Sequence, residues 1–192
     1  MLQLVSFLDC AWLNEPERWS VDEQGLHVET DDKTDFWRDT HYGFTRDSGH
    51  FLGKAVRGGF TAQIHFHAIY SSLYDQAGLM VRTDAEHWLK ASAEYQGGGI
   101  STLGVVMTDV KSNWSLADFG GNHVYLRVKR LGEVLGVYHS LDGQAWHLMR
   151  MGPLPLPDPV QAGVYTCCPI DAGLEARFDY ITVSPPDSDK FH

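Results

Sequence analysis

Long hydrophobic runs are missing from this sequence. No stretch approaches the roughly 20 consecutive apolar residues that a membrane-spanning helix needs, so we expect no membrane partner. The first 19 residues, MLQLVSFLDCAWLNEPERW, lack a basic start and are interrupted by Asp9 and Glu15. We therefore expect no secretory signal peptide.

Basic residues are also scarce. The 192 residues contain 15 Lys and Arg against 25 Asp and Glu, which gives a formal net charge of −10. Proteins that bind a phosphate backbone present clustered Lys and Arg, and no such cluster stands out here. We therefore expect no nucleic-acid partner.

Cysteine occurs only at Cys10, Cys167 and Cys168. An odd count with two adjacent residues does not suit a disulfide framework, so reduced thiols in a cytoplasmic protein are the simplest interpretation. Cys167 and Cys168 fit buried structural thiols better than nucleophiles, because no His lies beside them in the sequence.

Short runs that alternate apolar and polar residues dominate the chain. They include GFTAQIHFHA (59–68), NHVYLRVKRLG (122–132) and LEARFDYITV (174–183). Such alternation predicts strands with one buried face, and turn signals such as LDGQ (141–144) separate the runs. The pattern predicts an all-β sandwich or barrel without helices. We expect one domain over residues 1–184 and a C-terminal tail over 185–192.

Proline excludes one segment from the interior of a sheet. The four prolines of GPLPLPDP (152–159) remove hydrogen-bond donors, so this segment cannot be a central strand.

Two hairpins can be paired in register. YDQAGLMVR (74–82) and HWLKASAEYQ (87–96) flank TDAE (83–86), and facing residues must lie on the same side of the sheet. This predicts the pairs Arg82–Trp88, Met80–Lys90, Gly78–Ser92 and Gln76–Glu94. A loop at Gly97, Gly98 and Gly99 adds the pairs Glu94–Thr102, Ser92–Gly104, Lys90–Val106 and Trp88–Thr108.

The face away from the core in these hairpins predicts a trough. A row of small residues, Gly78, Ser92 and Gly104, runs between rows of larger polar residues. Another segment either covers this trough or walls it, and TDFWRDTHYGF (34–44) is the natural candidate. We expect it to edge the trough, with His41 and Tyr42 directed toward Lys90 and Glu94.

These same segments, with SNWS (112–115) and YHSLDGQAW (138–146), resemble the "regulation of enolase" family of uncharacterised proteins. That family belongs to the concanavalin A-like lectin/glucanase superfamily, and the resemblance spans roughly residues 10–183. It implies a jelly-roll sandwich of two antiparallel sheets, one of them concave, and it implies no settled activity. Asn113 stands where the family pattern has Asp, so no role that needs a carboxylate there is expected.

Catalytic and metal-binding motifs are sparse. A glycosidase needs two carboxylates roughly 5–10 Å apart, and only Glu94 can be placed on the trough face, so we assign no catalytic residue. His65 and His67 share one strand face, a spacing that suits a metal, but no further ligand is evident. Two exposed strand histidines are the favoured interpretation, and we expect no metal and no cofactor.

The trough instead suits a carbohydrate or another small polar ligand. Aromatic rings can stack on a sugar while polar groups bind its hydroxyls. Two alternatives remain: a protein-interaction module that modulates a metabolic enzyme, and a glycoside hydrolase with an unrecognised carboxylate pair. The predicted ligand-binding residues are Trp37, His41, Tyr42, Tyr74, Gln76, Arg82, Trp88, Lys90, Glu94, Thr102 and Trp114.

Overall fold

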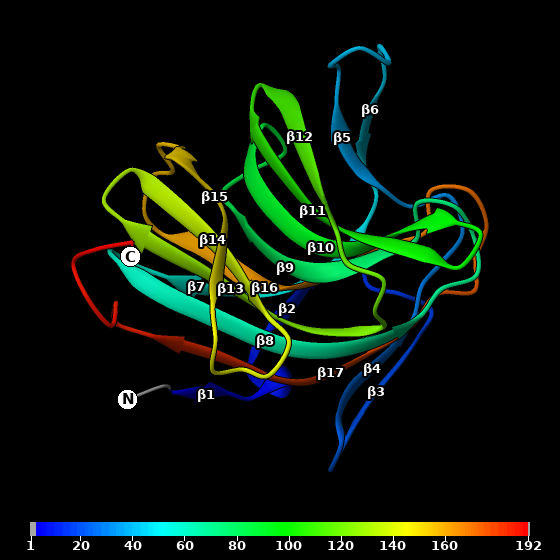
Figure 1. Cartoon of the computed structure of the whole chain (residues 1–192), viewed down its shortest axis with the longest axis horizontal. Helices are drawn as coiled ribbons and strands as arrows, with labels where there is room; N and C mark the ends of the chain where they lie inside the picture. Colours follow the sequence, from blue (N-terminus) through cyan, green and yellow to red (C-terminus); the bar gives the residue numbers. More distant parts are fainter. Residues whose placement is uncertain (1–2, 192) are drawn as a thin grey trace.

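The computed structural model describes residues 3–191 as two antiparallel sheets packed face to face, with a small hairpin rising from one of them (Figure 1). The only helix among these residues is a single 3-10 turn, η1 (Phe7–Asp9). Within the described residues no helix has the length and apolar character to cross a membrane. The predicted all-β sandwich is confirmed.

The first sheet has seven strands in the order β12-β11-β10-β9-β16-β7-β2. Its strands are β2 (Ala11–Leu13), β7 (His50–Val56), β9 (Gln76–Arg82), β10 (His87–Gly97), β11 (Ile100–Asp109), β12 (Lys111–Asp118) and β16 (Val160–Cys167).

The second sheet has eight strands in the order β15-β14-β13-β8-β17-β4-β3, with β1 paired to β17. Its strands are β1 (Leu4–Val5), β3 (Arg18–Asp22), β4 (Gly25–Glu29), β8 (Phe60–Ile69), β13 (His123–Leu131), β14 (Val134–Ser140), β15 (His147–Pro153) and β17 (Glu175–Ser184).

The main core lies between the two sheets. The three alternating runs of the sequence form β8, β13 and β17, and their apolar faces supply buried residues such as Ile64, Phe66 and Leu126. Removing these side chains from water is the main favourable contribution to folding. The proline-rich segment does not enter this interior as a central strand, because β15 is an edge strand that ends at Pro153.

The predicted register of β9, β10 and β11 is confirmed at every pair. Gln76 faces Glu94, Glu94 faces Thr102, and the remaining pairs follow. The glycine loop is tighter than expected, because β10 continues to Gly97 and the register shifts between Tyr95 and Gly97. Gly98 and Gly99 then make the turn, with positive φ angles of 61° and 81° that favour glycine.

The segment TDFWRDTHYGF forms most of a hairpin of two short strands, β5 (Phe36–Arg38) and β6 (Thr45–Asp47). It lies over the outer face of the seven-stranded sheet, the face predicted to be a trough. There Phe36 packs against Trp88 and Tyr165, with ring centroids 6.2 Å apart in both pairs. The hairpin therefore covers the end of the trough at Arg82, Trp88 and Thr108 with a second apolar cluster.

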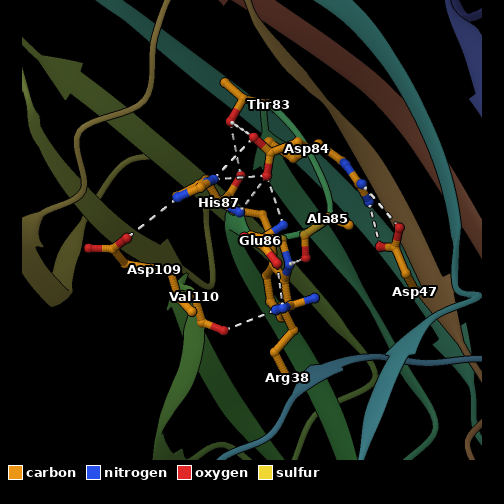
Figure 2. A network of polar contacts seen from close by, with 11 residues as sticks. Arg38, Asp47, Thr83, Asp84, Ala85, Glu86, His87, Asp109 and Val110 are labelled. Carbon is orange, nitrogen blue, oxygen red and sulfur yellow. Dashed lines mark hydrogen bonds and ion pairs between the residues drawn. The ribbon is translucent and has the colours of Figure 1, made fainter.

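Polar contacts hold this hairpin in place (Figure 2). Arg38 donates from Nε to the carbonyl oxygen of Val110 at 2.9 Å and pairs with Glu86 at 2.6 Å. On the other strand of the hairpin, Asp47 pairs with Arg82 at 2.9 Å. The hairpin is thus fixed through β5 to the β9–β10 and β11–β12 turns and through β6 to the end of β9.

The tail also packs on the sandwich. The ammonium group of Lys129 on β13 donates to Asp187 at 2.6 Å and to Ser188 at 2.7 Å. The hydroxyl of Tyr138 on β14 donates to the carbonyl oxygen of Phe191 at 2.5 Å.

Candidate functional site

A cavity of about 360 Å³ opens over the part of the trough that the β5–β6 hairpin leaves uncovered. Its floor comes from β9, β10 and β11, and its walls come from the hairpin, β12 and the loops beside them. The lining residues are Lys33, Asp35, Trp37, Tyr42, Phe44, Arg46, Tyr74, Gln76, Lys90, Glu94, Val106, Trp114, Pro169 and Ile170.

Aromatic rings form the wall on the hairpin side. The Trp37 ring lies 5.6 Å from that of Tyr42 and 6.3 Å from that of Trp114, measured between centroids. Tyr42 in turn stacks on Phe44 at 5.9 Å. Tyr74, in the loop before β9, adds a further half-exposed ring to the lining. The cavity therefore offers several aromatic faces to a ligand.

Lys90 is a buried cation at the centre of the floor. Its ammonium group donates to the carbonyl oxygen of Phe36 at 2.7 Å and to Asp35 Oδ1 at 3.2 Å. A buried charge is tolerated when a counter-charge and further hydrogen bonds accompany it. Asp35 also accepts from the backbone N–H of Phe36 at 2.7 Å, so this carboxylate is occupied in holding Lys90 and the hairpin.

Glu94 is the other charged group of the floor. Its Oε1 accepts from Gln96 Nε2 at 2.7 Å, and Gln96 also donates to the hydroxyl of Thr102 at 3.2 Å. Burial raises the pKa of the Glu94 carboxyl to about 7, although Lys90 and Gln96 act in the opposite direction. Near neutral pH this side chain can therefore act either as a hydrogen-bond donor or as an acceptor.

Gly104 lies directly beside the carboxyl group of Glu94. A Cβ atom at Gly104 would lie 3.6 Å from Glu94 Oε2 and 3.5 Å from a methyl group of Leu116. The row of small residues predicted from the sequence thus leaves room directly beside the carboxyl group.

Gln76 is fixed by two hydrogen bonds. Its Oε1 accepts from the hydroxyl of Tyr165 at 3.0 Å, and its Nε2 donates to the carbonyl oxygen of Tyr74 at 3.2 Å. The polar floor is therefore set before any ligand binds, which lowers the entropic cost of binding.

Seven of the predicted ligand-binding residues line this cavity: Trp37, Tyr42, Tyr74, Gln76, Lys90, Glu94 and Trp114. Tyr42 lines the same cavity as Lys90 and Glu94. His41 does not line the cavity; its ring packs on that of Tyr42 with centroids 5.0 Å apart.

Three other predicted residues also lie outside the cavity lining. Trp88 is fully buried beneath Phe36, and Arg82 is paired with Asp47. Thr102 is beside the cavity but hydrogen-bonded to Gln96. All three lie in the predicted rows of the trough, and of the two alternatives for the hairpin, covering holds at Arg82 and Trp88.

Several lining residues were not among the predicted ligand-binding residues. Asp35 and Phe44 belong to the segment already proposed as a wall, so their position next to Trp37 and Tyr42 was an available signal. Lys33, Pro169 and Ile170 come from loops brought to the cavity only by the tertiary fold, and no local pattern indicates them.

The structure corrects one expectation outside the cavity. His65 is not an exposed strand histidine, because its side chain lies under the ring of Tyr125 at 3.9 Å and its Nδ1 bonds to Asp179 at 2.6 Å. The three cysteines are free, and Cys167 and Cys168 are buried, as predicted. Burial raises the pKa of both buried thiols.

Comparison with known proteins agrees with this architecture. A family model described as "Protein of unknown function (DUF1349)" matches residues 12–186. The chain is 44% identical over 183 residues to "Regulation of enolase protein 1" of Saccharomyces cerevisiae, and the match covers 94% of this chain and 92% of the yeast protein.

Solved structures share the fold. A functionally unknown protein from Saccharomyces cerevisiae matches with a TM-score of 0.91 at 43% identity, over 96% of this chain and all of the other. A GH43 protein from Bacillus licheniformis matches at 15% identity with a TM-score of 0.74, over 96% of this chain but 38% of that one. A legume lectin-like domain from Entamoeba histolytica matches at 10% identity with a TM-score of 0.63, over 93% and 91% of the two chains.

The last two similarities concern the fold alone, a lectin-like sandwich. The family model and the yeast relative both extend over almost the whole chain, including the hairpin and the strands that build the cavity. The chain therefore belongs to the DUF1349 family, together with the yeast regulation of enolase protein.

Proposed function

We propose that the cavity binds a small polyhydroxylated ligand, such as a sugar, and holds it without transforming it. The observation that carries this proposal is the combination of aromatic walls with a preformed polar floor. Rings of Trp37, Tyr42 and Trp114 suit the apolar faces of a sugar ring, while Gln76 and Glu94 suit its hydroxyls.

The size and charge of the cavity agree with this ligand class. A volume of about 360 Å³ lies at the lower end of the range for small-molecule sites, roughly 300–1,000 Å³. The floor carries Lys90 and Asp35 as an internal ion pair, and burial favours the neutral form of Glu94. The floor therefore matches a neutral polar ligand, while Arg46 adds a cation on the wall, where it lies over the ring of Phe44. The free thiols suit a cytoplasmic setting, which we propose for the protein.

A ligand panel with a matched pair of variants tests the proposal. Thermal shift against neutral sugars and polyols should identify compounds that raise the unfolding midpoint, and calorimetry should then give affinities. Trp114→Ala should weaken binding at least about fivefold, because a stacking ring contributes on the order of 1 kcal/mol or more. Trp19→Ala is the control, since Trp19 is 37% exposed against 36% for Trp114 but lies on the other sheet.

The outcomes separate clearly. Equal loss of affinity in both variants would place the ligand elsewhere or show a general effect on the fold. Binding restricted to anionic compounds would contradict the neutral-ligand proposal. Turnover of a bound glycoside that disappears in Glu94→Gln would show that the cavity is an active site.

A protein partner is the second candidate. The name of the yeast relative indicates regulation of enolase. The observation in favour is an apolar rim, since Tyr42, Phe44, Trp114, Leu116 and Ile170 are exposed around the cavity. Exposed aromatic rings are enriched at protein interfaces. Sedimentation velocity with enolase from the same organism tests this, and a complex weakened by Trp114→Ala but not by Trp19→Ala would support it.

A further inference from the structure

A cluster of histidines and one carboxylate lies on the outer face of the eight-stranded sheet, the side of the molecule opposite the cavity. His65 and His67 project from β8 and Asp179 projects from β17. One potential ligand atom from each of the three lies within 4.8 Å of the others. Neither the proposed ligand cavity nor the core packing uses this cluster.

A β-bulge lies at the carboxylate and places Asp179 and Tyr180 on the same face of the sheet. β17 pairs Phe178 with Phe66 and then Tyr180 with His65, so Asp179 is the extra residue of the bulge. Bulges redirect side chains in this way. Asp179 and Tyr180 both reach polar partners on the outer face, where Tyr180 accepts from Gln63 at 2.7 Å.

The Asp179 carboxylate is oriented between the two imidazoles. Its Oδ2 lies 2.6 Å from His65 Nδ1 and 3.5 Å from His67 Nε2. Its other oxygen accepts from Arg177 Nε at 2.9 Å, which fixes the plane of the carboxylate. Two imidazole nitrogens and one carboxylate oxygen therefore converge. Arg177 holds the carboxylate in position, and such supporting hydrogen bonds are usual around bound metals.

Both rings are held by their neighbours. His65 is only 8% exposed and stacks on Tyr125, and its Nε2 is buried without a hydrogen-bond partner among the described residues. His67 stacks on His123 of β13 with centroids 5.4 Å apart. The His123 ring is also 5.7 Å from that of His65, so a third imidazole borders the cluster.

We propose that His65, His67 and Asp179 bind a divalent first-row transition-metal ion, best matched by Zn²⁺, with His123 or water as the fourth ligand. Two ligands that bind one zinc ion tetrahedrally at about 2.0–2.1 Å lie about 3.3 Å apart. The 3.5 Å separation is close to that value, whereas the 2.6 Å pair is a hydrogen bond that must widen as the ion replaces its proton. Two imidazoles and one carboxylate suit Zn²⁺, whereas Mg²⁺ and Ca²⁺ prefer oxygen ligands alone.

The site is open to ions from solution. His67 has a side chain that is 39% exposed, and it lines a second cavity together with Asn122 and Arg177. The net charge of −10 favours the approach of a cation, although Arg177 is a local positive charge. Arg177 already contacts Oδ1 and leaves Oδ2 available to the ion.

Calorimetry on protein treated with a chelator and then desalted tests the proposal, with ZnCl2 and MgCl2 as separate titrants. We expect one Zn²⁺ site per chain that is lost or weakened at least about tenfold in His67→Ala and in Asp179→Asn, and no comparable Mg²⁺ site. His147→Ala is the control, because His147 stacks on His139 at 5.3 Å on the same sheet without a carboxylate between them. Its Zn²⁺ affinity should stay within about twofold of the wild type.

A second readout keeps the test independent of folding effects. CoCl2 should give the visible absorption of a four-coordinate Co²⁺ ion with wild type and His147→Ala, and not with His67→Ala, whose exposed position allows the variant to fold. The proposal fails if wild type binds no Zn²⁺, if binding survives both substitutions, or if His147→Ala removes it.

Discussion

Glu94 gives the sharpest test of the cavity floor, because its burial makes protein stability depend on pH. The side chain is 4% exposed, and burial raises the pKa of its carboxyl from the ordinary 4.5 to about 7. Between these two values the folded protein keeps a proton that the unfolded chain has released, so the free energy of unfolding falls as the pH rises.

The magnitude follows from the same two values. A difference of about 2.5 between 7 and 4.5, at 1.36 kcal/mol per pH unit, corresponds to a loss on the order of 3 kcal/mol, complete above about pH 7. Glu94→Gln removes the ionisation but can still accept the hydrogen bond from Gln96. Relative to wild type, the variant should therefore gain about 3 kcal/mol of unfolding free energy between about pH 4 and pH 8.

Urea unfolding of both proteins at several pH values in that range measures the difference. Glu133→Gln, in the exposed turn after β13, reports the effect of removing one surface carboxylate. A stability difference that stays constant with pH would refute the assignment of Glu94 as a buried acid. A difference that favours wild type more strongly as the pH rises would show that Glu94 is stabilised in its ionised form by Lys90.

Two further predictions concern the hairpin and the thiols. Phe36→Ala should lower the free energy of unfolding by about 3–5 kcal/mol in urea unfolding, because Phe36 is fully buried. Phe44→Ala on the same hairpin should cost below about 1 kcal/mol, because Phe44 is half-exposed. Similar losses in the two variants would show that the second cluster is not a packed core. In the folded protein, Cys167 and Cys168 should resist an aromatic disulfide reagent, because both thiols are buried and have raised pKa values. After unfolding, the reagent should modify all three thiols. Rapid modification of all three without denaturant would contradict the prediction, whereas reaction of half-buried Cys10 alone would not.

The sequence predicts the strands and their local register well, because both depend on short-range patterns. Adjacent hairpins fix which residues face one another, so the rows Gln76–Glu94–Thr102 and Gly78–Ser92–Gly104 follow from alternation and turn length alone. The residues of the polar floor could therefore be predicted from the sequence.

Which part of that floor the hairpin covers could not be predicted in the same way. The β5–β6 hairpin is placed by contacts distant in the sequence, such as the hydrogen bond from the backbone N–H of Arg38 to the Ser112 hydroxyl at 2.9 Å. Nothing in the alternation of β9 or β10 distinguishes Lys90, which borders the open cavity, from Trp88, which is covered. Phe36 accounts for the difference, because its ring packs on Trp88 and covers it.

The strand that carries Asp179 departs from simple alternation, and the spacing of its buried residues indicates where. Phe178 and Ile181 are both buried although three positions separate them, and a regular strand would place them on opposite faces. The run LEARFDYITV must therefore contain a bulge between these two residues, and the structure has it at Asp179. Alternation from buried Phe178 already places Asp179 on the face that holds His65 and His67, and the irregular spacing of the two buried residues indicates that Tyr180 joins it on that face. The same spacing argument identifies where a strand departs from its partner, and in this sheet that position is where three potential metal ligands meet.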